Sequence, residues 1–185
     1  MRTIQTERLV LRNFGPGDAQ ALFEYMHKPV AACFFDEALP NMEAAQADVA
    51  KRSGDDGQIA VCLKDGDMLI GDLFAHSERE DVPGWDSVSV GWNFNPAFAG
   101  RGYAYEAAQA LFAHLFGQPR IRRLYAYVED HNSSSERLCE KLGMRKEGVF
   151  VEYVTFGDDE AGQPIYENTM QYAILRREWE ASLRG

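Results

Sequence analysis

The sequence has no long hydrophobic run and few cysteines. No apolar stretch approaches the ~18 to 20 residues that a helix needs to cross a bilayer, and residues 1–6 hold no signal-peptide hydrophobic core. The three cysteines, Cys33, Cys62 and Cys139, lie far apart and form no C-x-x-C motif. These absences argue against a membrane protein, a disulfide framework and a zinc site. We expect a cytoplasmic protein with reduced thiols.

Positive charge is also scarce. The 185 residues include 19 Lys and Arg against 29 Asp and Glu, a formal net charge of -10. Such a chain binds nucleic acid phosphates poorly through bulk electrostatics and attracts cationic partners instead, although acidic surfaces also serve solubility alone. The four histidines, His27, His76, His114 and His131, form no metal-binding pattern. We therefore expect no nucleic acid, membrane or metal among the partners.

Near its middle the sequence predicts a strand, a glycine turn and a helix. Val88, Val90, Trp92 and Phe94 alternate with Ser89, Gly91 and Asn93, as in a strand with one buried face. From Ala104 the apolar residues recur at intervals of three and four, which predicts an amphipathic helix from Tyr103 to Phe116. The turn between them is Ala-Gly-Arg-Gly at residues 99–102.

The start of this helix has no residue of the usual capping type, since no Ser, Thr, Asp or Asn lies at residues 98–103. Glycines let a ligand approach the backbone closely, and free N–H groups at the positive end of a helix dipole suit an anion such as a pyrophosphate. The alternative is that Gly100 and Gly102 only make a tight turn.

Three motifs, which occur along the chain in the same order as in the family, resemble the GCN5-related N-acetyltransferases. Gly100-Arg101-Gly102-Tyr103-Ala104, followed by Glu106-Ala107 and behind Gly91-Trp92, resembles their acyl-CoA pyrophosphate loop. Residues 132–144, N-S-S-S-E-R-L-C-E-K-L-G-M, resemble the N-x-x-S…E-K-L-G-F segment of the ribosomal-protein-acetyltransferase-like (RimJ/RimL-type) branch. Residues 6–12, T-E-R-L-V-L-R, are also typical of that branch.

The resemblance implies an α+β fold: a mixed, largely antiparallel central sheet, splayed at its middle and flanked by helices, in a single domain over residues 1–185. The residue patterns agree, with no internal repeat or linker. We expect further strands at 7–13 (an edge strand), 58–63, 68–74, 124–128, 147–156 and 168–174. We expect further helices after the N-caps Asp18, Asn41 and Ser133, the last of them ended by Gly143, and at 176–183, with residues 30–40 irregular.

The resemblance also implies a binding site for acetyl-CoA or another short acyl-CoA. The residues that match the family's contacts are Trp92, Asn93, Phe94, Ala99, Gly100, Arg101, Gly102, Tyr103, Ala104, Asn132 and Ser135. Backbone N–H groups around Asn93 and Phe94 would polarise the thioester carbonyl, and Asn132 would bond the pantetheine arm. The loop departs from the family pattern at Ala99, where Gln or Arg is usual.

Many members carry a tyrosine seven residues after this asparagine as proton donor to the CoA thiolate, and here that position is Cys139. The branch pattern favours Ser135 for the role; the alternative is a serine bonded back to its own helix. Ser133 and Glu136 fit a capping box for that helix. Family analogy points to Glu152 as general base, although Val154, predicted on the same strand face, could hold the usual position and leave Glu152 a surface carboxylate.

The implied function is an N-acyltransferase that moves an acetyl group to a primary amine by direct attack. The acceptor would be a small molecule or a protein N-terminus, and a cationic one fits the acidic loop that carries Glu78, Glu80, Asp81 and Asp86. Phe34, Phe35 and Asp36 could line the acceptor pocket or pack in the core. The chain would be a monomer or homodimer. The alternative function is a catalytically idle acyl-CoA-binding protein on the same fold.

Overall fold

The computed structural model describes residues 2–79, 82 and 84–184. They form two compact units, one of Met1–His76 with Gly91–Leu111 and one of Ser77–Val90 with Phe112–Gly185. Strand β5 (Ser87–Phe94) and helix α3 (Tyr103–Phe116) each contribute residues to both units. Every helix in the described ranges is too short or too polar to span a bilayer.

The sheet of the first unit is antiparallel. Its strands β1 (Ile4–Gln5), β2 (Leu9–Arg12), β3 (Gln58–Leu63) and β4 (Leu69–His76) pair in chain order. The end of β5 follows β4, where the Asn95 N–H donates to the Ile70 carbonyl at 3.0 Å. Because β1 pairs with the outer side of β2, the prediction that this segment is an edge strand is wrong.

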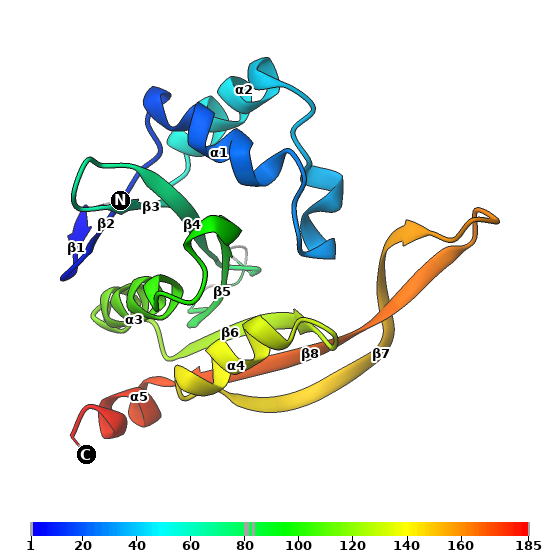
Figure 1. The fold of residues 1–185 in the computed structure, drawn as a ribbon. Coiled ribbons are helices and arrows are strands. Elements are labelled where there is room, and N and C mark those ends of the chain that lie inside the picture. Colours follow the sequence, from blue (N-terminus) through cyan, green and yellow to red (C-terminus); the bar gives the residue numbers. More distant parts are fainter. Residues whose placement is uncertain (1, 80–81, 83, 185) are drawn as a thin grey trace. The chain divides into compact units, whose positions relative to one another are not determined.

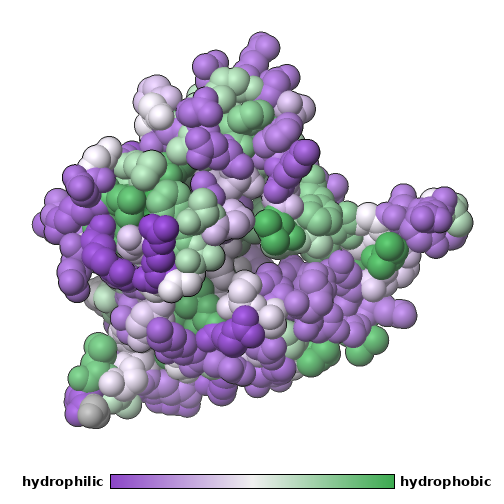
Figure 2. Space-filling model, in the orientation of Figure 1, coloured by the Kyte–Doolittle hydropathy of each residue, from purple (hydrophilic) through white to green (hydrophobic). Residues whose placement is uncertain are grey.

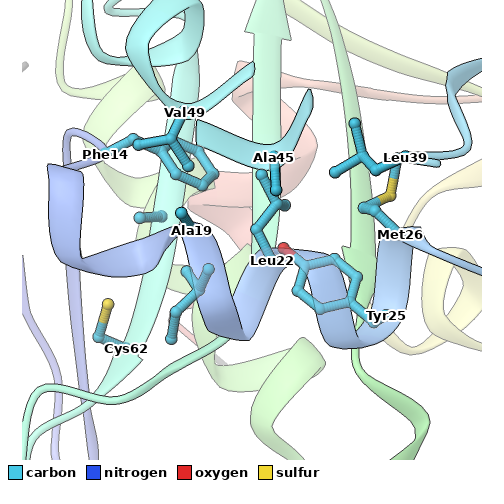
Figure 3. Close-up of a cluster of buried hydrophobic side chains, with 11 residues drawn as sticks. Phe14, Ala19, Leu22, Tyr25, Met26, Leu39, Ala45, Val49 and Cys62 are labelled. Atoms are coloured by element: carbon cyan, nitrogen blue, oxygen red, sulfur yellow. The ribbon is translucent and has the colours of Figure 1, made fainter. Parts of the chain in front are cut away.

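The helices of the first unit are α1 (Ala19–Met26), α2 (Met42–Ser53) and the first part of α3, with short 3-10 helices η1 (Pro16–Asp18), η2 (Ala32–Glu37) and η3 (Pro96–Phe98). Apolar side chains of α1, α2 and the strands beneath form one core, shown in Figure 3, that includes Phe14, Leu22, Met26, Val49 and Cys62. Phe34 packs against this core, whereas Phe35 is exposed, so η2 replaces the irregular segment expected at residues 30–40.

The two predicted caps of this unit differ in outcome. Asn41 caps α2 as expected, because its side chain accepts a hydrogen bond of 2.9 Å from the Ala44 N–H. Asp18 makes no such bond to α1; its carboxylate accepts from the Gly15 N–H and pairs with Arg12, both at 2.7 Å. The charge of Arg12 therefore directs Asp18 away from the helix start.

A polar network lies under α1 and α2. The Tyr25 hydroxyl donates to Asp72 at 2.7 Å, and Arg52 pairs with Asp72 at 3.3 Å and with Asp48 at 2.6 Å. Asp72 is 1% exposed. Burial raises the pKa of Asp72 to about 6, although Arg52 and the Tyr25 hydrogen bond act in the opposite direction. The ionised form of Asp72 is therefore stabilised by Arg52 and by the Tyr25 hydroxyl.

The second unit pairs the first half of β5 in parallel with β6 (Arg123–Glu129), from Ser87 with Arg123 to Ser89 with Tyr125. Next to β6 comes β8 (Pro164–Leu175) and then β7 (Arg145–Asp158), both antiparallel to their neighbours. Figure 1 shows β7 and β8 side by side as a long hairpin. Helices α4 (Ser133–Lys141) and α5 (Arg176–Ser182) complete the unit, and Trp179 of α5 packs edge-on against Phe112 and at a tilt against Phe116. These mixed, mostly antiparallel strands with flanking helices confirm the predicted α+β class.

The buried Asp72 makes a testable prediction about stability and pH. Its folded pKa lies above its unfolded value, so its contribution to stability is complete below the unfolded pKa and decreases as pH rises through about 6. Asp72→Asn removes this dependence. The stability advantage of the original chain over Asp72→Asn should therefore be larger at about pH 4.5 than at about pH 7, by about 2 kcal/mol. Urea unfolding at both pH values measures it; an equal advantage at both would contradict the shifted pKa.

Candidate acetyl-CoA site

The glycine loop at the start of α3 has the backbone that a phosphate site needs. Gly100 and Gly102 have φ values of +74° and +80°, in the left-handed region that favours glycine. A Cβ on Gly100 would meet nothing within 4 Å, so this face of the loop is open. The first N–H groups of α3 have no partners within the helix. The two glycines thus precede α3 in a backbone conformation that fits the predicted turn.

Arg8, from the segment before β2, fixes the conformation of this loop. Its Nη1 donates to the Arg101 carbonyl at 3.0 Å, and its Nε and Nη2 pair with Glu106 Oε2 at 2.7 and 2.6 Å. Its guanidinium carbon lies 4.6 Å from the centroid of the Tyr103 ring. One arginine therefore contacts the loop and the first turn of α3 together.

Glu106 binds more than the Arg8 guanidinium. It also accepts a hydrogen bond of 2.6 Å from the Thr6 hydroxyl and one of 2.9 Å from the Arg8 N–H. Burial raises the pKa of Glu106, but these hydrogen bonds from Thr6 and Arg8 outweigh it and leave the pKa below its usual range. We call Thr6, Arg8 and Glu106 the loop clamp. Sequence reasoning recognised both segments as family motifs but missed that they bind each other.

The residues of this loop fit the diphosphate of acetyl-CoA. An open backbone at two glycines, the positive end of a 14-residue helix and the exposed Arg101 side chain offer hydrogen bonds and positive potential to an anion. Arg101 lies over the Phe98 ring, 5.7 Å from its centroid. Ala99, where the family usually has Gln or Arg, adds no charge. The backbone therefore carries most of the fit.

The three strand residues predicted to bind acyl-CoA lie at the end of β5, in the same unit. Trp92, Asn93 and Phe94 are all half-buried. Asn93 donates from Nδ2 to the Met26 sulfur at 3.0 Å, and its carbonyl lies so close to Gly71 that a Cβ there would come within 2.6 Å. Close packing on β4 thus fixes the backbone at Asn93 and Phe94.

Asn132 and Ser135 come together in the second unit. Asn132 is the N-cap of α4, since its Oδ1 accepts from the Ser135 N–H at 3.2 Å and from the Ser134 hydroxyl at 2.9 Å. The prediction that Ser133 is the N-cap is therefore wrong, and Ser133 is the first helical residue. Glu136, the predicted partner in that capping box, instead accepts from Lys146 and Tyr172.

Ser135 and Cys139 differ in their surroundings, one helical turn apart. Ser135 is half-buried. Cys139 is 0% exposed, and burial raises the pKa of its thiol to about 12. The thiol therefore stays neutral and serves as a small apolar group. Gly143, with φ +79°, ends α4 as predicted.

Glu152 lies in an irregular part of β7. The register shifts between Phe150, which faces Thr169, and Val154, which faces Glu167. Glu152 has φ +50°, and its N–H donates to Asn168 Oδ1 at 2.9 Å. The expected regular alternation of Glu152 and Val154 on one strand face is therefore absent. Glu152 is exposed and Val154 half-buried.

The predicted site residues divide between the units. Trp92 to Phe94 and Ala99 to Ala104 belong to the first, with the loop clamp; Asn132, Ser135 and Glu152 belong to the second. Among the described residues, no group of three or more His, Cys, Asp or Glu is placed to hold a metal ion.

Comparison with known proteins identifies the family. Residues 8–145 match the family model of the acetyltransferase (GNAT) domain. An uncharacterized N-acetyltransferase of Bacillus subtilis, YnaD, is 34% identical over 95% of this chain and 98% of its own length. Another uncharacterized N-acetyltransferase, p20 of Bacillus licheniformis, is 28% identical over 97% of this chain and 99% of its own length. The crystal structure of a GNAT-family acetyltransferase from Bacillus anthracis has a TM-score of 0.82, with 29% identity, 95% of this chain and 99% of that chain covered.

The chain therefore belongs to the GNAT acetyltransferase family and is an N-acetyltransferase. The general reaction of this family transfers an acetyl group from acetyl-CoA to an amine. This result favours the enzyme over the alternative of an idle binding protein on the same fold.

The glycine loop predicts the effect of a single substitution. Gly102→Asp should abolish acetyl-CoA binding, because it places a negative charge where a phosphate needs close backbone approach. Gly102→Ala is the matched control: it has the same strain of about 1–2 kcal/mol from a positive φ, without the charge. Its Cβ would meet Arg8 at an ordinary 3.5 Å. Calorimetric titration with acetyl-CoA compares them, and a folded Gly102→Asp protein with the original affinity would refute the phosphate site.

Proposed function

We propose that residues 1–185 form one acetyltransferase domain that moves the acetyl group of acetyl-CoA to a primary amine by direct attack in a ternary complex. The observation that carries the proposal is the glycine loop of α3 with its clamp. A clamped loop with open N–H groups binds the diphosphate in a fixed position, and a fixed position brings the thioester and the amine together. The same residues would accept another short acyl-CoA.

In this proposal the acyl-CoA contacts are those that the family resemblance implies. The binding residues are Trp92, Asn93, Phe94, Ala99, Gly100, Arg101, Gly102, Tyr103, Ala104, Asn132 and Ser135. Backbone N–H groups near Asn93 and Phe94 polarise the thioester carbonyl. The Oδ1 atom of Asn132 accepts hydrogen bonds at the start of α4, and its Nδ2 donates to Glu129 Oε2 at 3.4 Å. The second N–H of Nδ2 is therefore the group that would bond the pantetheine arm.

Ser135 is the proposed partner of the leaving thiolate. A serine hydroxyl is a weak acid, so its role is a hydrogen bond that strengthens as charge forms on sulfur, directly or through water. The neutral, fully buried Cys139 in the usual tyrosine position supports this assignment. Glu152 is the proposed general base, since an exposed carboxylate can accept the proton that the amine loses.

The proposed acceptor is a cationic amine, either a small molecule or a protein N-terminus as in the RimJ/RimL-type branch that the motifs resemble. The net charge of -10 supports it. Within the acidic loop, Asp86 is paired with Arg122 at 2.6 Å, while Glu80 and Asp81 lie outside the described residues. The chain acts as a monomer or homodimer, and a cytoplasmic location stays a prediction of the sequence.

Free-thiol release tests the function. With acetyl-CoA and a panel of amines, the chain should release CoA thiol faster with cationic amines and basic peptides than with neutral amines. The difference should shrink as ionic strength rises, because salt screens the attraction to an acidic surface within about 10 Å at ~0.1 M. No release with any amine would contradict acetyl transfer. Rates that do not depend on salt would contradict the charge steering but not the acetyl transfer.

The proposed donor makes a separate prediction. Ser135→Ala should lower kcat by ~10- to 1000-fold and change acetyl-CoA binding much less, because the lost hydrogen bond forms chiefly in the transition state. Cys139→Ala is the control on the same helix face and should change kcat little. Steady-state kinetics and calorimetry separate the two effects. A severe loss in Cys139→Ala with full kcat in Ser135→Ala would reverse the roles.

A further inference from the structure

Four aromatic side chains gather on one face of the second unit's sheet. Tyr125 and Tyr127, two residues apart on β6, have ring centroids 5.8 Å apart. Tyr127 lies 6.2 Å from Phe150 and 6.3 Å from Tyr153 of β7, and these two rings lie 5.0 Å from each other. We call Tyr127, Phe150 and Tyr153 the aromatic face. The rings come from two strands that are not neighbours in the sheet (Figure 1).

The intervening strand leaves room for this contact. Gln171 of β8 lies opposite Tyr127 on one side and opposite Gly148 on the other. A Cβ on Gly148 would meet nothing within 4 Å, so the Tyr127 ring has open space on the β7 side. Phe150 follows two residues after Gly148 and reaches back across β8.

The irregularity in β7 completes the cluster. Phe150 and Tyr153 are three residues apart, so in a regular strand they would point to opposite faces. The register shift between Phe150 and Val154 instead brings their rings together. The backbone conformation is stabilised by the Asn168 side chain, which accepts from the Glu152 N–H and donates to Asp130 at 2.8 Å. Bulges are common beside binding sites, where they redirect a side chain.

The aromatic face stays open to solvent. Tyr127, Phe150 and Tyr153 are 38%, 39% and 57% exposed, while hydrophilic residues dominate the surface in Figure 2. Thr169, opposite Phe150 in the register, is only 4% exposed, and its hydroxyl has no hydrogen-bond partner within the described part of the chain. This hydroxyl can therefore form a hydrogen bond with a molecule that binds beside Phe150.

The charges around these rings favour a cation. Burial and then the negative charge of Glu78 raise the pKa of Tyr127, which places that carboxylate near the rings. Aromatic faces attract ammonium and guanidinium groups. Arg123 already lies over the adjoining Tyr125 ring, 5.2 Å from its centroid, with its charge balanced by Glu147 at 2.6 Å.

We propose that Tyr127, Phe150 and Tyr153 bind an organic cation, a second ammonium or quaternary group on the acceptor amine. The inference rests on the acetyl transfer to amines proposed above. The reacting amine must lose its proton before it attacks, so the cation held by the rings is a different group of the same acceptor. The acceptor class is therefore a small amine with two cationic centres, such as a diamine. The negative charge of Glu78 adds to the attraction.

Comparing the affinity for choline with the affinity for its neutral carbon analogue, 3,3-dimethylbutan-1-ol, measures the contribution of the positive charge. The chain should bind choline about tenfold more tightly, and Tyr127→Leu and Tyr153→Leu should each lower that preference about 2- to 30-fold, since leucine keeps apolar bulk and removes the ring. Tyr166→Leu is the matched control, because Tyr166 is also 57% exposed on the same hairpin but makes no contact in the cluster. Equal binding of both probes, or equal losses in Tyr153→Leu and Tyr166→Leu, would overturn the site.

Comparing the kinetics of acetyl transfer to 1,4-diaminobutane and to butylamine separates this inference from the proposed function. The diamine should have the lower KM, and Tyr153→Leu should raise its KM toward that of butylamine with little change in kcat. Turnover of both amines with equal KM would overturn the cation site while leaving acetyl transfer intact. Preference for choline without thiol release from any amine would support the cation site and contradict acetyl transfer.

Discussion

The candidate site depends first on the ion pair between Arg8 and Glu106. Taken alone, a partly exposed pair of this kind stabilises a fold by about 1 kcal/mol or less. Its importance here is geometric, because Arg8 also bonds the Arg101 carbonyl and covers the Tyr103 ring. Two guanidinium nitrogens bind one oxygen of Glu106, while its other oxygen accepts from Thr6 and the Arg8 N–H, and together these bonds fix orientation as well as distance. The loop is thereby held in its left-handed glycine conformation before any ligand arrives.

This arrangement also reconciles an acidic chain with a polyanionic substrate. The overall field of a chain with net charge -10 repels phosphates. Glu106 takes much of the charge of Arg8, so the attraction must come from short-range groups: the N–H groups of the loop, the end of the α3 dipole and Arg101. Such groups act over a few ångströms, where they exceed a screened surface field. The acidic surface remains free to attract a cationic acceptor.

Local signals predicted much of this structure. The period of apolar residues and the flanking glycines placed α3 at Tyr103–Phe116, and Gly143 ended α4 as expected. The predictions failed where two residues or two partners compete for one role, and where the contact joins residues far apart in the sequence. Asn132 and Ser133 are both good capping residues and adjacent, so propensity could not choose between them. Glu106 lies 98 residues from Arg8, and no periodicity indicates such a contact. Asp18 satisfied the capping rule, but Arg12 bound it more strongly.

The irregularity at Glu152 shows why a missed detail bears on function. A residue other than glycine with φ near +50° costs about 1–2 kcal/mol relative to an ordinary conformation. Stability alone would favour glycine or asparagine there. The glutamate stands in a segment that Asn168 and Asp130 hold in place, directly before Tyr153 in the sequence. Strained residues concentrate where a side chain must be presented in a particular direction. The same distortion thus presents the proposed base and completes the aromatic face, which a regular β7 strand could not do.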